Sequence, residues 1–320
     1  MYEDSGNRGG ETMKRIHKKI RLLACIFGLA ILIVSLGCNI YFAFFKQDND
    51  SRSVGYIKEE SYLQDTEQIY IMESGILKNT LDFRAGGDLP ITYDFDNEEY
   101  PELIANYQID TIAGEGTEFD RALKLMNEFA PRLTHESNYD NHIAMDALSL
   151  LAYSLDNKNH GINCRNKAQI LNEMCLALGI YARKVWINPN SVYDNDCHVV
   201  NEVWDTSLEK WIMLDITNNQ YWIDENGVPL SILEIREKGA NQEFCTPVGA
   251  GDNLDHPKQL QRKHKNEFLY IMKNLVYMEY CKDNTVGESD TLYLLCPKNI
   301  STDYIYILSE SACMASPVKE

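Results

Sequence analysis

Three residues near the middle of the chain have side chains that could together carry out nucleophilic chemistry. Cys164 is followed after 34 residues by His198, and after a further 17 residues by Asp215. A thiol, an imidazole and a carboxylate are the nucleophile, the general base and the orienting group of a triad that transfers acyl groups. Because these residues are far apart in sequence, the segments that carry them decide whether the triad can form.

Cys164 directly precedes a segment with the periodicity of a helix. The apolar residues that share one face of this helix are Ala168, Leu171, Met174, Cys175 and Leu178. Gly179 then supplies the expected C-terminal stop. A thiol at a helix N-terminus lies at the positive end of the macrodipole, which favours the thiolate over the thiol. The segment therefore predicts a nucleophile at the start of a buried helix.

His198 and Asp215 lie on two predicted strands, HVVNEVW and WIMLDIT, which follow a first strand YARKVWI. The turn-like segment DTSLEK joins the two. If Asp205 pairs with Lys210, Val200 faces Asp215, and His198 lies diagonally from Asp215 on the same face. A slip of one residue would put the imidazole and the carboxylate on opposite faces. The prediction of a His198–Asp215 pair therefore depends on this register.

The run G-x-x-C…A…L…LGI-x-AR-x-V, followed by HVVNEVW and KWIMLD-x-T, resembles the transglutaminase-like superfamily, which has a papain-like cysteine-protease core. The likeness extends over about 120 residues, from Thr111 to Arg236. It implies that Cys164 is the nucleophile, His198 the base and Asp215 the orienting group. It does not assign the second oxyanion donor beside the Cys164 backbone amide.

One position departs from the pattern of this family. A small residue often follows the family's cysteine, whereas Arg165 stands there in this chain. A guanidinium group at this position could favour the thiolate or could obstruct the cleft. The sequence leaves both alternatives open.

The flanking segments predict the fold class. A helix is expected to start at Thr117 and to end at Pro131, and a second helix is expected from Ile143 to Leu155. Helices followed by strands indicate an α+β domain, with the nucleophile helix and its neighbours covering one side of an antiparallel sheet. The segment from Trp222 to Glu237 predicts a turn at 225–227 and a short helix from Ser231.

Leu22 to Phe45 is a run of 24 residues without a charge. As a helix it would be about 36 Å long, enough to cross a hydrocarbon core of about 30 Å. Five basic residues precede it, so the positive-inside rule predicts a cytoplasmic N-terminus and an extracytoplasmic body. The alternatives are a cleaved signal peptide and lipoprotein processing at Cys38. Because the apolar run continues past Cys38, we expect an uncleaved single-pass anchor in the cell membrane.

The composition limits the partners. After residue 45 the chain has 24 Lys+Arg against 45 Asp+Glu, a net charge of −21, which argues against nucleic acid as a partner. The seven cysteines beyond the anchor show no zinc-type spacing, so neither a metal nor a cofactor is expected. Their odd number is consistent with one thiol kept free for chemistry. Cys197 is expected in the core or in a disulfide.

The expected organisation has five parts: a basic cytoplasmic tail (1–21), the anchor (22–45), a stalk and N-terminal extension (46–110), the transglutaminase-like domain (111–237) and a C-terminal extension (238–320). The N-terminal extension is expected to contribute one or two strands, such as IYIM. Lys238 to Lys265 is expected to be an exposed loop. Beyond it, FLYIMKNLVYMEYC, TLYLLC and YIYIL are expected to form strands.

Two functions fit these features. The first is a membrane-anchored, extracytoplasmic thiol enzyme that performs acyl transfer or hydrolysis on an amide of a peptide or protein substrate, including cell-wall peptide. The alternative is a catalytically inactive interaction module of the same fold at the cell surface. Rapid, selective alkylation of Cys164 near neutral pH is expected of the enzyme and not of the module.

Overall fold

A computed structural model describes residues 59–191 and 193–318 of the chain. The predicted tail (1–21) and anchor (22–45) lie outside the described residues. Within the described part, no helix combines the length and the apolar character that a membrane crossing requires. The chain divides into two compact units, Met1–Gln64 and Asp65–Glu320, and the architecture below is that of the second.

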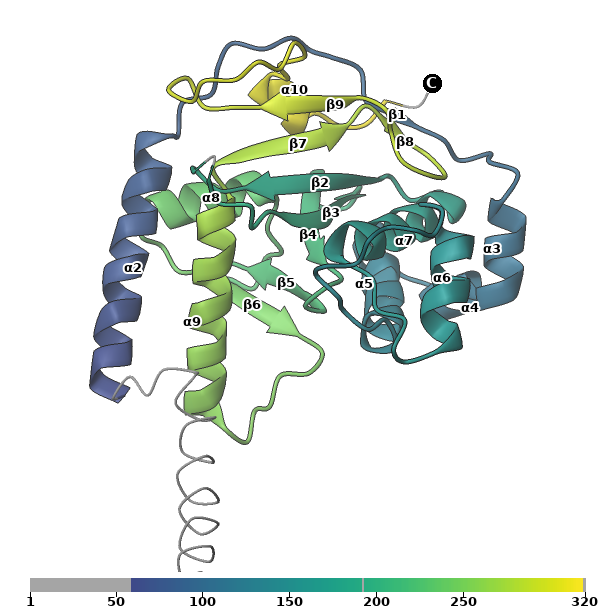
Figure 1. Ribbon diagram of the computed structural model, residues 1–320, viewed down its shortest axis with the longest axis horizontal. Helices are drawn as coiled ribbons and strands as arrows, with labels where there is room; N and C mark the ends of the chain where they lie inside the picture. The colour runs from purple at the N-terminus through teal and green to yellow at the C-terminus, as the bar shows by residue number, and fades with distance from the viewer. Residues whose placement is uncertain (1–58, 192, 319–320) are drawn as a thin grey trace, which may run out of the picture. The chain divides into compact units, whose positions relative to one another are not determined.

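The centre of the second unit is an antiparallel sheet of seven strands (Figure 1). Their spatial order is β6-β5-β4-β3-β2-β7-β9. The strands are β2 (Ala182–Asn188), β3 (His198–Asp205), β4 (Lys210–Asp215), β5 (Gln220–Ile223), β6 (Thr246–Gly249), β7 (Tyr277–Cys281) and β9 (Leu292–Leu295). A separate parallel pair joins β1 (Thr92–Tyr93) to β8 (Asp283–Asn284). The site described below is built on β3 and β4, in the middle of the large sheet.

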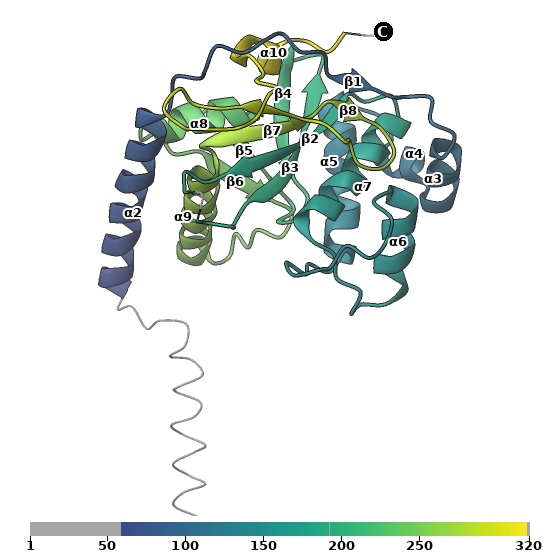
Figure 2. The same ribbon diagram turned by 45° about the horizontal axis from the view of Figure 1, so that its top comes forward.

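Helices lie on both sides of this sheet, and Figures 1 and 2 show them in two groups. The first group is α3 (Tyr100–Tyr107), α4 (Ile109–Ala113), α5 (Glu118–Phe129) with the 3₁₀ turn η1 (Ala130–Arg132), α6 (Ala147–Asp156) and α7 (Cys164–Ala177). The second is α2 (Glu59–Asn79), of which the residues from Asp65 on belong to this unit, α8 (Ile232–Ala240) and α9 (Pro257–Asn274). A short helix, α10 (Glu310–Met314), lies near the end of the described chain.

Local sequence signals explain where the helices of the domain begin. Thr117 forms a capping box with Asp120 at the start of α5, and Ser231 forms one with Glu234 at the start of α8. Both starts confirm the sequence prediction. The predicted turn before α8 is also present, with Gly227 in the left-handed region at φ 79°.

The sheet is covered on both faces, and the expectation of helices on one side alone is wrong. On one face, Val203, Ile212 and Leu214 join the core formed by α3–α7. On the other, Val200 and Met213 join a second core that includes residues of α2, α8 and α9. The α+β class is confirmed. The second layer was missed because two of its helices, α2 and α9, lie in the N- and C-terminal extensions, where strands and a loop were expected.

Two predicted strands of the extensions are helices in the structure. IYIM lies inside α2, where Tyr70 and Leu77 pack into the second core. The end of the predicted loop Lys238–Lys265 and the first half of the predicted strand FLYIMKNLVYMEYC merge into α9, which starts at Pro257. The second half of that predicted strand forms β7. The apolar residues of α9 are confined to one face near its end, so its polar first half resembles a loop in sequence. The prediction for TLYLLC is confirmed by β9, whereas YIYIL forms only isolated bridges.

Candidate active site

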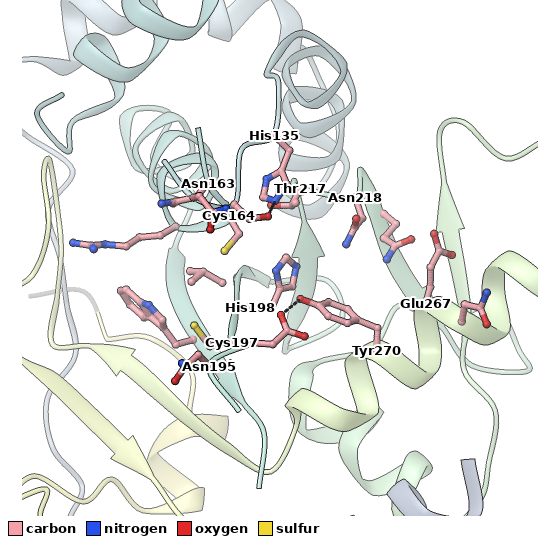
Figure 3. A pocket seen from close by; sticks show the side chains of 18 residues that line it. His135, Asn163, Cys164, Asn195, Cys197, His198, Thr217, Asn218, Glu267 and Tyr270 are labelled. Carbon is pink, nitrogen blue, oxygen red and sulfur yellow. Dashed lines mark hydrogen bonds between the residues drawn. The ribbon is translucent and has the colours of Figure 1, made fainter. Parts of the chain in front are cut away.

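The thiol of Cys164 lies at the first residue of α7 (Figure 3). Asn163 caps the helix, because its side chain accepts a hydrogen bond from the Asn166 backbone while the Asn166 side chain accepts one from the Asn163 backbone. This reciprocal arrangement fixes the start of the helix at Cys164. The Asn201 amide on β3 donates to the Ala168 carbonyl at 2.9 Å, which ties the first turns of α7 to the sheet.

His198 and Asp215 form a buried hydrogen-bonded pair. His198 Nε2 lies 2.9 Å from Asp215 Oδ2, and both side chains are buried. Strands β3 and β4 pair with Asp205 opposite Lys210, so the predicted register is confirmed. The register puts the imidazole and the carboxylate on one face of the sheet, as the diagonal relationship requires.

Both oxygens of the Asp215 carboxylate accept hydrogen bonds. Oδ1 accepts from the backbone N–H groups of Thr217 and Asn218, at 3.0 and 3.2 Å. Oδ2 accepts from the Asn218 side-chain amide at 2.8 Å in addition to the imidazole. Burial raises the pKa of Asp215, but His198 and these donors outweigh it, and the net pKa is lowered. The carboxylate is therefore ionised and fixed in orientation.

The thiol and the imidazole influence each other's charge. Burial raises the pKa of Cys164, but a hydrogen bond from His198, the His198 charge and the Val199 backbone N–H together lower it below its ordinary value. Burial lowers the pKa of His198, but Asp215 and the Cys164 thiolate more than reverse this and raise it. Both shifts favour a thiolate–imidazolium pair. Such a pair is an activated nucleophile next to a general acid–base group.

A cavity of about 720 Å³ opens onto this pair. Its wall near α7 includes His135 and Asn163, and the opposite wall includes Glu267 and Tyr270 of α9 (Figure 3). Arg165 also lines the cavity. An open cleft of this volume can hold a short segment of a peptide substrate. Within the described residues, no group of three or more His, Cys, Asp or Glu side chains could hold a metal ion.

Comparison with known protein families identifies a family match over the segment that carries this site. The family model of the Transglutaminase-like superfamily matches residues 105–216, a segment that contains Cys164, His198 and Asp215. This chain contains a transglutaminase-like superfamily domain. No curated protein and no solved structure matches the chain significantly.

The unusual residue of the transglutaminase-like domain, Arg165, has a defined partner. Its guanidinium group makes a two-point ion pair with Glu288, with Nε donating to Oε1 at 2.6 Å. Glu288 lies 123 residues away and outside the family match. Arg165 borders the cavity next to the thiol, and the carboxylate compensates its charge.

Cys197 lies on the rim of the cavity, exposed and free. The expectation that it belongs to the core or to a disulfide is therefore wrong. It precedes the first residue of β3, where the sheet no longer covers it. The other described cysteines are also free, and all except Cys164 and Cys197 are buried.

Sequence reasoning missed several residues of the site. Tyr270 and Glu267 belong to α9, which was expected to be a loop and a strand, and Glu288 belongs to a loop after β8. His135 comes from the segment before α6 and had no recognisable pattern around it. No spacing signal could have found these residues, because each reaches the site only through long-range packing.

Proposed function

We propose that this protein is a thiol enzyme that performs acyl transfer or hydrolysis on an amide of a peptide or protein substrate. The observation that carries the proposal is the position of His198, whose Nε2 is bonded to Asp215 while its ring also contacts the Cys164 thiol. The lowered pKa of Cys164 and the raised pKa of His198 support these roles. The transglutaminase-like domain is consistent with a thiol enzyme that modifies amides.

In the proposed mechanism, the Cys164 thiolate attacks the carbonyl carbon and the carbonyl electron pair moves to the oxygen. When the tetrahedral intermediate collapses, the C–N bond breaks and the His198 imidazolium donates its proton to the departing amine. The product is an acyl-thioester at Cys164. Asp215 holds the imidazole so that its other nitrogen faces the thiol.

The second half of the reaction reverses these roles. Neutral His198 accepts a proton from water or from an incoming amine, which attacks the thioester and releases the thiol. Water gives hydrolysis and an amine gives transamidation. The triad serves both acceptors equally, so the cleft beyond the triad selects between them.

Thiol alkylation tests the proposed roles. The rate at which iodoacetamide modifies Cys164, followed by mass spectrometry across pH, should have its inflection below the ordinary thiol value of about 8.5. His198→Ala should move the inflection to higher pH, because it removes the imidazole whose hydrogen bond and charge stabilise the thiolate. Cys197→Ala, at the other exposed thiol of the cleft, is the control and should leave the profile unchanged. A Cys164 that behaves as an ordinary thiol in both proteins would instead support a catalytically inactive interaction module.

We also propose that residues 22–45 anchor the protein in the cell membrane, with the body outside the cytoplasm, where an exported peptide or cell-wall peptide is the substrate. The proposal rests on the length of this apolar run and on the basic residues before it. Protease added to intact spheroplasts should digest the body and spare the first residues of the chain. Protection of the C-terminal end would reverse this topology.

A further inference from the structure

His135 is held beside the nucleophile by backbone contacts. The Glu136 N–H donates to the Ile162 carbonyl, and the Ile162 N–H donates to the Thr134 carbonyl, each at 3.0 Å. His135 thus pairs with Ile162, which lies two residues before Cys164. On the other side, Lys167 Nζ donates to the Leu133 carbonyl at 2.7 Å. These contacts fix the backbone of the His135 segment relative to the first turn of α7.

The side chain of His135 faces the reaction site. It lines the same cavity as Cys164 and His198, and Figure 3 shows the three residues around one space. Attack on a carbonyl would create an oxyanion there. The Cys164 backbone N–H can bind it, because the first N–H groups of a helix lack intrahelical acceptors and the Asn163 cap is bonded to the N–H of Asn166. An oxyanion of this kind is usually stabilised by more than one donor.

We propose that the His135 imidazole N–H is the second donor to the oxyanion, opposite the Cys164 backbone N–H. The proposal rests on the function proposed above and adds a catalytic residue to it. Ser137 Oγ lies 3.0 Å from His135 Nε2. When this hydroxyl donates, the ring proton resides on Nδ1, which has no partner within the described part of the chain.

The surroundings keep this imidazole neutral. Partial desolvation lowers the pKa of His135, whose side chain stays exposed toward the cavity, and the nearby charges of Lys167 and His198 lower it further. A neutral imidazole can donate a hydrogen bond to a developing oxyanion without transferring its proton to the thiolate. The Lys167 charge adds a positive field on the same side.

Three neighbouring polar side chains are less suited to this role. The Asn163 amide donates to Asn141 Oδ1 at 3.2 Å, and the Asn218 amide donates to Asp215. Thr217 also borders the cavity and its hydroxyl has no partner in the described residues, but the oxygen itself is buried, which makes it the rival donor. His135 therefore combines access to the cavity with an unused donor.

Two reactions of the same thiol separate oxyanion stabilisation from thiol activation. Alkylation by iodoacetamide forms no oxyanion, whereas acylation by p-nitrophenyl acetate does. His135→Ala should lower the acylation rate of Cys164 on the order of 10²-fold and leave the alkylation rate and its pH inflection unchanged. His135→Gln, which keeps an N–H donor, should recover part of the acylation rate. His142→Ala, at a partly exposed histidine paired with Asp140 outside the cavity, is the matched control.

These experiments distinguish failure of the His135 role from failure of the proposed enzyme function. If the wild-type thiol is acylated and His135→Ala is acylated as fast, His135 is not an oxyanion donor. The same conclusion follows if His135→Ala lowers acylation and alkylation equally, because the residue then acts through the thiol. If the wild-type thiol is alkylated but never acylated, the proposed enzyme function fails, and the role of His135 fails with it. Thr217→Val tests the rival donor, and a larger loss there than in His135→Ala would also overturn the assignment.

Discussion

The Tyr270 ring lies edge-on to the His198 imidazole, with ring centroids 5.6 Å apart and an interplanar angle of 65°. The Tyr270 hydroxyl donates to Asp196 Oδ1 at 3.4 Å. Tyr270 belongs to α9 and lies outside the segment that the family model matches. The C-terminal extension therefore supplies one wall around the imidazole.

Tyr270→Leu should weaken catalysis, because the imidazole loses its lateral contact and can tilt. A small misplacement of this kind can lower the rate of acylation by about 10- to 100-fold. Tyr270→Phe keeps the ring and loses only a long hydrogen bond, so it should remain close to wild type. The measurement is acylation of Cys164 by p-nitrophenyl acetate. Equal rates for the two variants would show that the ring does not position His198.

Asp215→Asn should abolish most of the activity and preserve the fold. The amide can still accept the backbone N–H groups of Thr217 and Asn218, but its NH₂ group would face His198 Nε2. The imidazole would then carry its proton on the nitrogen that faces the thiol, and turnover should fall by about 10⁴-fold.

The matched control for this substitution is Asn218→Ala, which removes one donor to Asp215 and leaves the carboxylate in place. Its effect on turnover should be much smaller. Thermal unfolding followed by circular dichroism checks that both variants are folded. Near-full activity of Asp215→Asn would show that another group orients His198.

Lys167 should make the free energy of unfolding depend on pH. Burial lowers the pKa of this lysine to about 8, whereas in the unfolded chain it is close to 10.4. Between these values the unfolded chain holds more protons than the folded protein, so the stability contributed by Lys167 rises with pH by about 3 kcal/mol. This contribution is fully present above the unfolded pKa and is lost as pH falls through about 8.

Lys167→Met should remove this part of the pH dependence. Urea unfolding of both proteins between pH 7.5 and 10.5 measures the difference. Lys298→Met, at an exposed lysine, is the control and should follow the wild type. A constant difference between wild type and Lys167→Met across this range would mean that the ammonium group is better solvated than its position indicates.

Glu288→Gln should change the charge beside the thiol. The carboxylate pairs with Arg165, and its Oε1 lies 3.6 Å from Nζ of the buried Lys184. Without the carboxylate charge, both cations act on the cleft unopposed, so the pKa of Cys164 should fall further. The alkylation profile measures the shift, and urea unfolding should show a stability loss of about 1–2 kcal/mol. Glu128→Gln, in the exposed pair with Arg132, should change neither quantity.

The sequence by itself determined the parts of the site that depend on local rules. The strand pattern around the 206–209 turn set the register of β3 and β4, because a slip of one residue would have turned the apolar side chains Val203 and Ile212 out of the core. The helical period that follows Cys164 placed the thiol at a helix start. Each of these rules acts within a hairpin or a single helix turn.

The tertiary structure alone decided how α7 is surrounded. Its periodicity predicted one buried face, yet every residue from Asn166 to Leu176 is buried. Several of its polar side chains find partners elsewhere in the chain: Gln169 Nε2 donates to the Gly287 carbonyl at 2.6 Å, and Glu173 accepts from the Ala147 and Gly287 backbone N–H groups. A hydrophobic pattern cannot reveal this, because it treats a buried hydrogen-bonded polar residue as exposed.

The walls of the cleft also depend on the tertiary structure. The Cys164–His198–Asp215 arrangement follows from one helix start and one hairpin, but its walls come from α9, from the loop with Glu288 and from the segment with His135. Glu288 reaches the site through its ion pair with Arg165, a residue more than 100 positions away in the sequence. His135 reaches it through backbone pairing with Ile162. Short-range patterns thus specified the reacting groups, whereas long-range packing specified what surrounds them.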